Sequence, residues 1–461
     1  MYKVSISGKL VEPLVEGGKG VAISNGYTCG AWAACGGAGT LSGTVPDSYD
    51  EANQIIRLKF EGQTRDERHK ELIQQTIRGC IEQIKIAHEI ANGNGAIQMN
   101  VLWEVGGIAE SLHGALQEAG HLLDGVVCGA GLPFALSEIA SKYGVYYNPI
   151  VSSSLAFAVL WKRSYSKHPD LLGSVIYEDP WVAGGHNGIS SREDPTKPES
   201  PMERILSLRK FMNNVGLRNT TIVIAGGVWT LSEWTQYINN PDLQPLAFQF
   251  GTRPLLTQES PISDEWKQRL VTLPDNIVKL HRFSPTGFYS SSVRNSFLQD
   301  LIDRSERQIK YSDSKTEVFN TEIPFGRRHV FIESNDLDKV KKWQSNGYSD
   351  LMKTPDSTLI FVTPASRQQI LTDQQNCMGC LSKCKFSNWD DKHGSTGIAP
   401  DPRSFCILKT LDDIAHGGSI ENNLMFAGQN VGRFKKDPFY ENGFIPTVAQ
   451  LYQRIKEEVQ G

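Results

Sequence analysis

Two groups of residues in this sequence have side chains and spacings suited to chemistry. The first is a single histidine, His186, which lies between glycines in the segment Ala-Gly-Gly-His-Asn-Gly at 183–188. The second is a set of four cysteines in one short stretch, Cys377, Cys380, Cys384 and Cys406. The other four cysteines are scattered through the first third of the chain, and we expect them to pack as small buried residues.

His186 is suited to general acid–base catalysis. The glycines around it offer little local packing that would bury the ring, so the ring can project into a cleft. The unperturbed pKa of an imidazole, about 6.5, also lies near working pH. The alternative is a loop histidine that bonds only to backbone, but a position between glycines just after a predicted strand favours the catalytic interpretation.

The late cysteines have the pattern C-x₂-C-x₃-C followed by a distant fourth cysteine. Thiolates at this spacing can converge on one centre, and four soft ligands suit zinc or an iron–sulfur cluster. Zinc sites more often pair two C-x₂-C units, so three close cysteines with a remote fourth favour a [4Fe–4S] cluster, with zinc as the alternative. Disulfides are less favoured because the sequence shows no secretory signal.

Two glycine-containing segments are suited to binding a phosphate group. They are Ala-Gly-Gly-Val at 225–228 and Gln-Phe-Gly-Thr-Arg at 249–253. Glycine lets the backbone amides approach an anion closely, and the threonine adds a hydroxyl donor. In a barrel, the loops after the seventh and eighth strands commonly bind phosphate, so a phosphate-bearing cofactor or substrate is expected there.

Eight apolar or β-branched runs that end near Gly, Ser or Asn predict the strands that position these residues. Helical periodicity fills the intervals, most clearly at 66–91 and 201–215. Eight strands that alternate with helices favour a closed (β/α)₈ TIM barrel of the α/β class, and the chemistry of such a barrel lies where the strands end. The predicted strands are residues 10–15, 39–41, 96–102, 125–128, 146–151, 174–177, 221–224 and 246–250.

The length of 461 residues exceeds one barrel, so we expect a second region. Residues 1–260 would form the barrel, and residues 261–426 an α+β region that contains the cysteine segment at 373–406. Helices are expected at 293–309 and 336–343, strands at 329–332 and 358–362, and a closing helix at 447–459.

Charge and hydropathy exclude several partner classes. Lys plus Arg number 47 and Asp plus Glu 51, a net charge of −4 that gives no general grip on nucleic acid or anionic lipid. The longest apolar run, residues 155–161, is far shorter than the ~18 residues of a membrane helix, and the N-terminus lacks the apolar stretch of a signal peptide. A soluble, cytoplasmic protein with a small-molecule substrate is therefore expected.

The ordered set of strand-end motifs resembles the nitronate monooxygenases, also called 2-nitropropane dioxygenases, a family that includes flavin-dependent enoyl-acyl carrier protein reductases. The resemblance covers roughly residues 8–260 and a short piece, Ala-Gly-Gln at 427–429, so that the C-terminal segment 427–461 would return to the barrel. It implies an FMN-binding barrel in which His186 is the catalytic base. The residues that would bind FMN are Gly18, Lys19, Asn100, Gly226, Gly227, Gln249, Phe250, Gly251 and Thr252.

Three departures from that family pattern bear on function. Lys19 stands where the family usually has Met, and it could favour an anionic reduced flavin or simply extend into solvent. The polar loop 187–200 could be a lid or a surface excursion. The cysteine segment is similar to the cluster-binding segment of dienoyl-CoA reductases, which join FMN on a barrel to an iron–sulfur centre.

The sequence thus leads to three hypotheses. The first is an FMN-dependent oxidoreductase of the nitronate monooxygenase type, assisted by a cluster that exchanges electrons with a partner. The second is a reductase of enoyl thioesters or other conjugated substrates, with NAD(P)H as the electron donor. The third, from another class, is a zinc-stabilised barrel that binds a phosphorylated ligand without redox chemistry.

Overall fold

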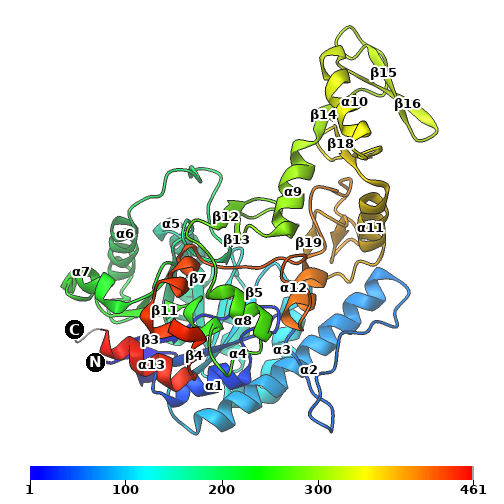
Figure 1. Ribbon diagram of the computed structural model, residues 1–461. Helices are drawn as coiled ribbons and strands as arrows, with labels where there is room; N and C mark the ends of the chain where they lie inside the picture. Colours follow the sequence, from blue (N-terminus) through cyan, green and yellow to red (C-terminus); the bar gives the residue numbers. More distant parts are fainter. Residues whose placement is uncertain (459–461) are drawn as a thin grey trace.

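The computed structural model describes residues 1–458, and its centre is a closed barrel of eight parallel strands (Figure 1). Each strand pairs with the next one along the chain, and the last closes onto the first, with Phe248 opposite Leu14. The predicted TIM barrel is confirmed. The barrel strands are β3 (Leu14–Glu16), β4 (Ala38–Ser42), β5 (Ala96–Leu102), β6 (Gly125–Gly129), β7 (Tyr146–Val151), β8 (Val175–Glu178), β10 (Ile222–Ala225) and β11 (Leu246–Phe250).

The first predicted strand, 10–15, is wrong as a single element. Its beginning belongs to β2 (Lys9–Val11), which forms a hairpin with β1 (Val4–Ile6), and the barrel strand starts only at Leu14. Pro13 separates the two because proline has no amide hydrogen for a strand ladder. The apolar side chains of the hairpin pack with the inward side chains of the barrel strands and close the amino end of the barrel.

Helices cover the outside of the barrel, and an extensive apolar layer lies between them and the strands. The predicted helix 66–91 is α2 (Arg65–Ala91), which starts in a capping box formed by Thr64 and Glu67. The closing helix is α13 (Val448–Glu457), and its last predicted residue, Val459, lies outside the described residues. The other helices are α1 (Gly26–Ala34), α3 (Ile108–Ala119), α4 (Leu136–Lys142), α5 (Ser154–Arg163), α6 (Pro201–Asn214) and α7 (Thr235–Ile238).

Residues between 260 and 426 lie over the rim of the barrel and then extend away from it. Two strands, β12 (Val278–His281) and β13 (Ser290–Val293), form a sheet with the short strand β9 (Gly185–His186) of the barrel. The predicted helix 293–309 is shorter, α9 (Ser296–Glu306), because strands occupy both of its predicted ends. The helices α8 (Asp264–Leu270), α11 (Pro364–Gln375) and α12 (Ile407–Ala415) and the hairpin of β19 (Lys383–Cys384) with β20 (Trp389–Asp390) complete this region.

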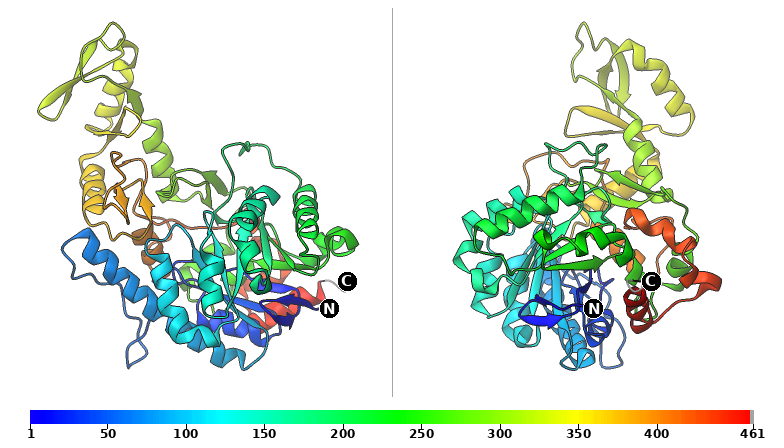
Figure 2. Two further views of the ribbon diagram at one scale, coloured as in Figure 1. Left: turned by 180° about the vertical axis from the view of Figure 1, so that it is seen from behind. Right: turned by 90° about the vertical axis from the view of Figure 1, so that its left-hand side faces the viewer.

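A small α+β lobe stands clear of the barrel in two opposite views (Figures 1 and 2). It has its own apolar core, which includes Ile323, Val340 and Phe361. The expected strands 329–332 and 358–362 and the helix 336–343 are found within it. Its elements are β14 (Gln308–Lys310), β15 (Thr321–Phe325), β16 (Arg328–Ile332), α10 (Leu337–Ser345), β17 (Asp350–Lys353) and β18 (Thr358–Val362).

None of the helices in residues 1–458 is long and apolar enough to cross a membrane. After the cysteine segment the chain returns to the barrel rim, where Gln429 N donates to Val182 O at 3.1 Å. It then ends with α13 beside α1 and the N-terminal strands (Figure 1).

Arg253 ties this returning segment to the end of β11. Its guanidinium, in a residue that is 1% exposed, lies 3.0 Å from Glu458 and 3.6 Å from Asp437 and donates to Trp229 O. We expect Arg253→Met to lower the free energy of unfolding in urea by about 3–5 kcal/mol, because two carboxylates lose their buried partner. Arg433→Met, which breaks an exposed pair with Glu233, should cost less than about 1 kcal/mol. Equal losses in the two variants would contradict this role.

Candidate active site at the mouth of the barrel

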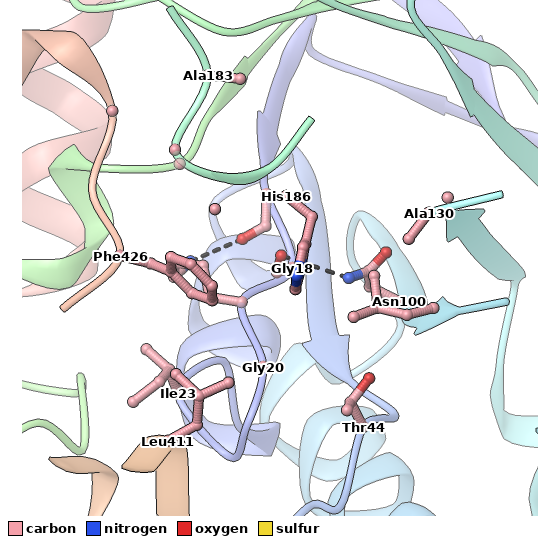
Figure 3. A pocket seen from close by; sticks show the side chains of 18 of the residues that line it. Gly18, Gly20, Ile23, Thr44, Asn100, Ala130, Ala183, His186, Leu411 and Phe426 are labelled. Carbon is pink, nitrogen blue, oxygen red and sulfur yellow. Dashed lines mark hydrogen bonds between the residues drawn. The ribbon is translucent and has the colours of Figure 1, made fainter. Parts of the chain in front are cut away.

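One cavity of about 250 Å³ lies at the carboxyl ends of the barrel strands (Figure 3). Its floor is made of inward-facing residues at or near the ends of successive strands, and its roof comes from the region after the barrel. The cavity brings together most of the predicted site. Lining it are Gly18, Lys19, Asn100, His186, Gly226, Gly227, Gln249, Gly251, Thr252 and, from the cysteine segment, Cys380.

Phe250 is the predicted cofactor residue whose side chain does not line the cavity. Successive side chains of a strand point to opposite faces, so Gln249 faces the cavity and Phe250 faces the helices. Phe250 is fully buried, with its ring centroid 6.1 Å from that of Trp32. It stabilises the site through its backbone instead, since Gly17 N donates to Phe250 O at 2.9 Å.

The loops after β10 and β11 have the geometry of an anion cradle. Gly226 and Gly227 adopt left-handed backbone conformations, with φ of +85° and +76°, which other residues rarely adopt. A Cβ atom on Gly251 would meet nothing within 4 Å, so this backbone is open on its outer side. Within residues 1–458, the amides of these three glycines donate to no protein acceptor outside the strand ladders. They are therefore available to a ligand such as a phosphate.

Asn100 and Gly18 meet in the wall of the same cavity. A Cβ atom on Gly18 would lie 2.3 Å from Asn100 Cβ, so only glycine permits this approach. The amide Nδ2 of Asn100 donates to Gly18 O at 3.4 Å, whereas its buried Oδ1 has no hydrogen-bond partner among the residues that the structure describes. A buried acceptor without a partner beside a cavity suits a ligand that donates a hydrogen bond.

Lys19 does not extend into solvent. Its Nζ lies 3.0 Å from Glu16 Oε1 and donates to Gly17 O at 2.7 Å, and Glu16 is 1% exposed. Burial raises the pKa of the Glu16 carboxyl, and the adjacent Lys19 charge opposes that rise. The lysine is therefore paired with the carboxyl group of Glu16 at the cavity wall.

His186 projects from β9 into the cavity, close to Asn100 and Phe426 (Figure 3). Its Nε2 lies 2.7 Å from Ser284 Oγ, and the Phe426 ring packs edge-on against the imidazole with centroids 5.4 Å apart. Burial lowers the pKa of His186 to about 4. The imidazole is therefore neutral at neutral pH. In this state one ring nitrogen can accept a proton or a hydrogen bond.

Glu178 is a cavity residue that the sequence reasoning missed. It ends β8 and faces the barrel axis, and within residues 1–458 its carboxyl has no hydrogen-bond partner. Burial and the nearby Asp179 raise its pKa to about 8. A carboxyl group directly after an apolar strand run was the signal available in the sequence.

The helix α12 forms an apolar wall of the cavity, which the sequence analysis did not predict. Its inward face and the loop after β3 line the cavity together, and Ile23 lies close to Leu411 and Phe426 in Figure 3. One side of the cavity is therefore suited to contact with an apolar part of a ligand. Its residues are Val21, Ile23, Val45, Leu255, Trp266, Ile407, Leu408, Leu411, Ile414, Leu424 and Phe426.

The four late cysteines come together beside this wall. Burial raises the pKa of Cys380, and the charges of Cys406, Cys384 and Cys377 raise it further, since the four thiols are close neighbours. Within the described residues, however, no group of three or more His, Cys, Asp or Glu side chains is arranged to hold a metal ion. The structure therefore gives direct support neither to the predicted [4Fe–4S] cluster nor to its zinc alternative.

The cysteine segment is fixed to the rim by the loop after β5. Leu381 forms a β-bridge with Val105, Gly106 N donates to Cys380 O at 3.2 Å, and Ser382 N donates to Glu104 O at 2.8 Å. These contacts place Cys380 in the cavity wall. The polar loop 187–200, in contrast, contributes nothing to the cavity lining and is held on α6 by Arg204, whose Nη1 lies 2.7 Å from Glu193.

His416 anchors the end of α12 to the rim. Its Nε2 lies 2.9 Å from Asp47 and its Nδ1 3.2 Å from Asp412. Burial opposes the charged imidazolium, but the hydrogen bonds and charges of Asp412 and Asp47 outweigh burial and raise the pKa of His416 to about 10.

This shift predicts a pH-dependent loss of stability on substitution. Because the folded pKa of His416 lies above the unfolded value of about 6.5, its contribution is complete below about pH 6.5 and fades as the pH rises towards 10. Urea unfolding should show His416→Gln destabilised by about 2 kcal/mol more at pH 6 than at pH 9. The exposed His329→Gln is the control. A His416→Gln penalty that does not change with pH would refute the ion pair.

Comparisons with known proteins support the fold. No protein-family model matches the chain, and no curated protein matches it by sequence. FabK from Thermotoga maritima shares 12% identity with a TM-score of 0.52, over 97% of this chain and 93% of that one.

Two further solved structures are similar over nearly the whole chain. A nitroalkane oxidase from Streptomyces ansochromogenes shares 14% identity with a TM-score of 0.51, over 97% of this chain and 95% of that one. The enoyl reductase domain of MlnA from Bacillus amyloliquefaciens shares 12% identity with a TM-score of 0.53, over 97% and 94%. At these identities the likeness establishes a common fold.

Proposed function

We propose that this protein is an FMN-dependent oxidoreductase that acts on an apolar substrate. The observation that carries the proposal is a single cavity in which an anion cradle, an unsatisfied amide oxygen and a neutral imidazole face an apolar wall. The resemblance of the strand-end motifs to an FMN-binding family and the fold shared with an enoyl reductase domain and a nitroalkane oxidase support it.

The residues present fit FMN. The free amides of Gly226, Gly227 and Gly251 suit its phosphate, and the unpartnered Oδ1 of Asn100 suits a donor on its ring system. FMN, when bound, supplies the hydride or electron transfer that no protein side chain provides. Lys19 would keep its positive charge near the cofactor, but Glu16 balances it, so its effect on the flavin should be modest.

The apolar wall favours reduction of an enoyl thioester or another conjugated substrate with a hydrocarbon part. An apolar chain gains about 25 cal/mol per Å² of surface that it buries, and α12 and its neighbours offer such a surface over one side of the cavity. NAD(P)H would be the electron donor. His186, neutral at neutral pH, would accept a hydrogen bond from the substrate and orient it.

Oxidation of a nitronate or nitroalkane is the second candidate. It is favoured by the same imidazole, because a neutral His186 is in the protonation state that a base needs to take a proton from a nitroalkane carbon. The sequence alone favoured nitronate oxidation, whereas the apolar wall favours reduction of an enoyl thioester or a similar substrate. The third hypothesis, a zinc-stabilised barrel without redox chemistry, is less favoured because the cavity combines the anion cradle with a neutral imidazole and an apolar wall.

A [4Fe–4S] cluster at Cys377, Cys380, Cys384 and Cys406 is the second part of the proposal. Each thiolate of such a cluster binds a different iron atom, so the thiolates stand farther apart than around one ion. The four cysteines are close neighbours beside the cavity, two of them buried and two half-buried, and their C-x₂-C-x₃-C spacing with a remote fourth cysteine favours a cluster over a single zinc ion. The position of Cys380 in the cavity wall would place the cluster within electron-transfer reach of the cavity.

Activity assays test the proposed reaction. The protein, purified without oxygen, should show flavin absorbance that NADPH bleaches and that a long-chain enoyl thioester restores, with little oxygen uptake on propionate nitronate. His186→Ala should bind FMN normally yet lose turnover by about 100-fold, because proton handling by a positioned side chain contributes that much. The exposed His121→Ala should match the native protein. Absence of flavin, or full turnover by His186→Ala, would defeat the proposal.

Metal analysis tests the cysteine site. The native protein should contain about four iron atoms per chain and show broad visible absorbance beneath the flavin bands. Cys377→Ala and Cys406→Ala should lose both signals, whereas Cys35→Ala, a change in the scattered group, should keep them. One zinc ion per chain, or iron retained after both substitutions, would show that the cluster assignment is wrong.

A further inference from the structure

The imidazole of His186 is held by a hydroxyl from outside the barrel. Ser284, which is 3% exposed, places its Oγ 2.7 Å from His186 Nε2. The same oxygen lies 2.8 Å from Thr286 Oγ1, and Thr286 lines the cavity. Both residues belong to the loop 282–289 between β12 and β13. A bond to one ring nitrogen sets the tautomer and the rotation of a histidine ring, so Ser284 controls how His186 faces the cavity.

The backbone of His186 is joined to the same hairpin. Ser290 of β13 pairs with His186 of β9, and Asn187 N donates to Tyr289 O at 3.0 Å. The hairpin therefore holds both the main chain and the side chain of the histidine.

The cysteine segment is hydrogen-bonded to this loop on both sides of Ser284. Ser404 Oγ donates to Phe283 O at 2.7 Å, and Lys385 N donates to Pro285 O at 2.9 Å. Lys385 directly follows Cys384, and Ser404 lies two residues before Cys406. The residues before and after Ser284 are thus each hydrogen-bonded to a residue that lies within two positions of a cysteine of the group.

We propose that Ser284 is the positioning residue for the His186 imidazole and that the four-cysteine segment holds Ser284 in place. The cysteine segment would then support catalysis by fixing the hairpin loop, and this role does not depend on whether the cysteines take part in electron transfer. A displacement of the order of 1 Å in a reacting group can lower turnover about 100-fold. Contacts that keep this loop, and with it the His186 ring, in place therefore help to maintain turnover. The turnover consequence rests on the proposed function, whereas the contact can be tested without any turnover.

The experiment compares four full-length variants with the native holoenzyme. Ser284→Ala removes the hydroxyl, Ser284→Thr restores it, and Ser404→Ala removes the support of Phe283 O. Ser291→Ala is the matched control, a buried serine of β13 whose hydroxyl has no partner in the described part of the chain. The readouts are FMN affinity, kcat and KM, and the rate at which diethyl pyrocarbonate modifies His186, measured by mass spectrometry of its peptide.

Loss of the hydroxyl should expose Nε2 and loosen the ring. We expect Ser284→Ala to raise the modification rate of His186 severalfold and to lower kcat about 10- to 100-fold, with KM and FMN affinity nearly unchanged. Ser284→Thr should restore most of the native modification rate and kcat. Ser404→Ala should raise the modification rate and lower kcat by less than Ser284→Ala does. Ser291→Ala should match the native protein.

Each outcome bears on one part of the inference. A native modification rate in Ser284→Ala would overturn the contact, and a native rate and kcat in Ser404→Ala would overturn the support by the cysteine segment. If even the native protein shows no turnover, the proposed function fails, while the modification rates still decide the positioning role of Ser284.

Discussion

The closure of the barrel between β11 and β3 is the constraint on which the rest of the structure depends. Phe248 lies opposite Leu14 and Phe250 opposite Glu16, so the last strand and the first meet in one register. Because all eight strands run parallel, closure brings their carboxyl ends to a single rim, where the loops after β3, β8, β10 and β11 surround one cavity. The same register turns Gln249 inward and Phe250 outward.

The region after the barrel converts an open rim into an enclosed site. The helix α12 supplies an apolar wall, His416 ties its end to Asp47, and the cysteine segment is bonded to the loop after β5 (Figure 1). The hairpin of β12 and β13 pairs with β9 and carries Ser284 to the imidazole of His186. The barrel thus supplies the glycine loops of the cavity, and the added region supplies its apolar wall and the hydroxyl beside His186.

Burial and pairing leave the cavity with little net charge. Lys19 is balanced by Glu16, burial lowers the pKa of His186 to about 4, and burial with Asp179 raises that of Glu178 to about 8. At neutral pH the cavity therefore presents an uncharged imidazole and an uncharged carboxyl group. Environments that move the pKa values of two nearby groups apart are typical of sites that transfer protons.

The sequence by itself determined the eight strands, the main helices and the glycine loops, because periodicity, caps and turn residues act over a few neighbouring positions. It misplaced the first strand, where Pro13 ends a local pairing, and it grouped Phe250 with Gln249 at the site, although strand alternation turns only Gln249 towards the cavity. Only the tertiary structure decided that α12 walls the cavity and that Ser284, 98 residues after His186, lies 2.7 Å from its ring nitrogen. Such contacts join segments distant in the chain and depend on packing, which leaves no local pattern in the sequence.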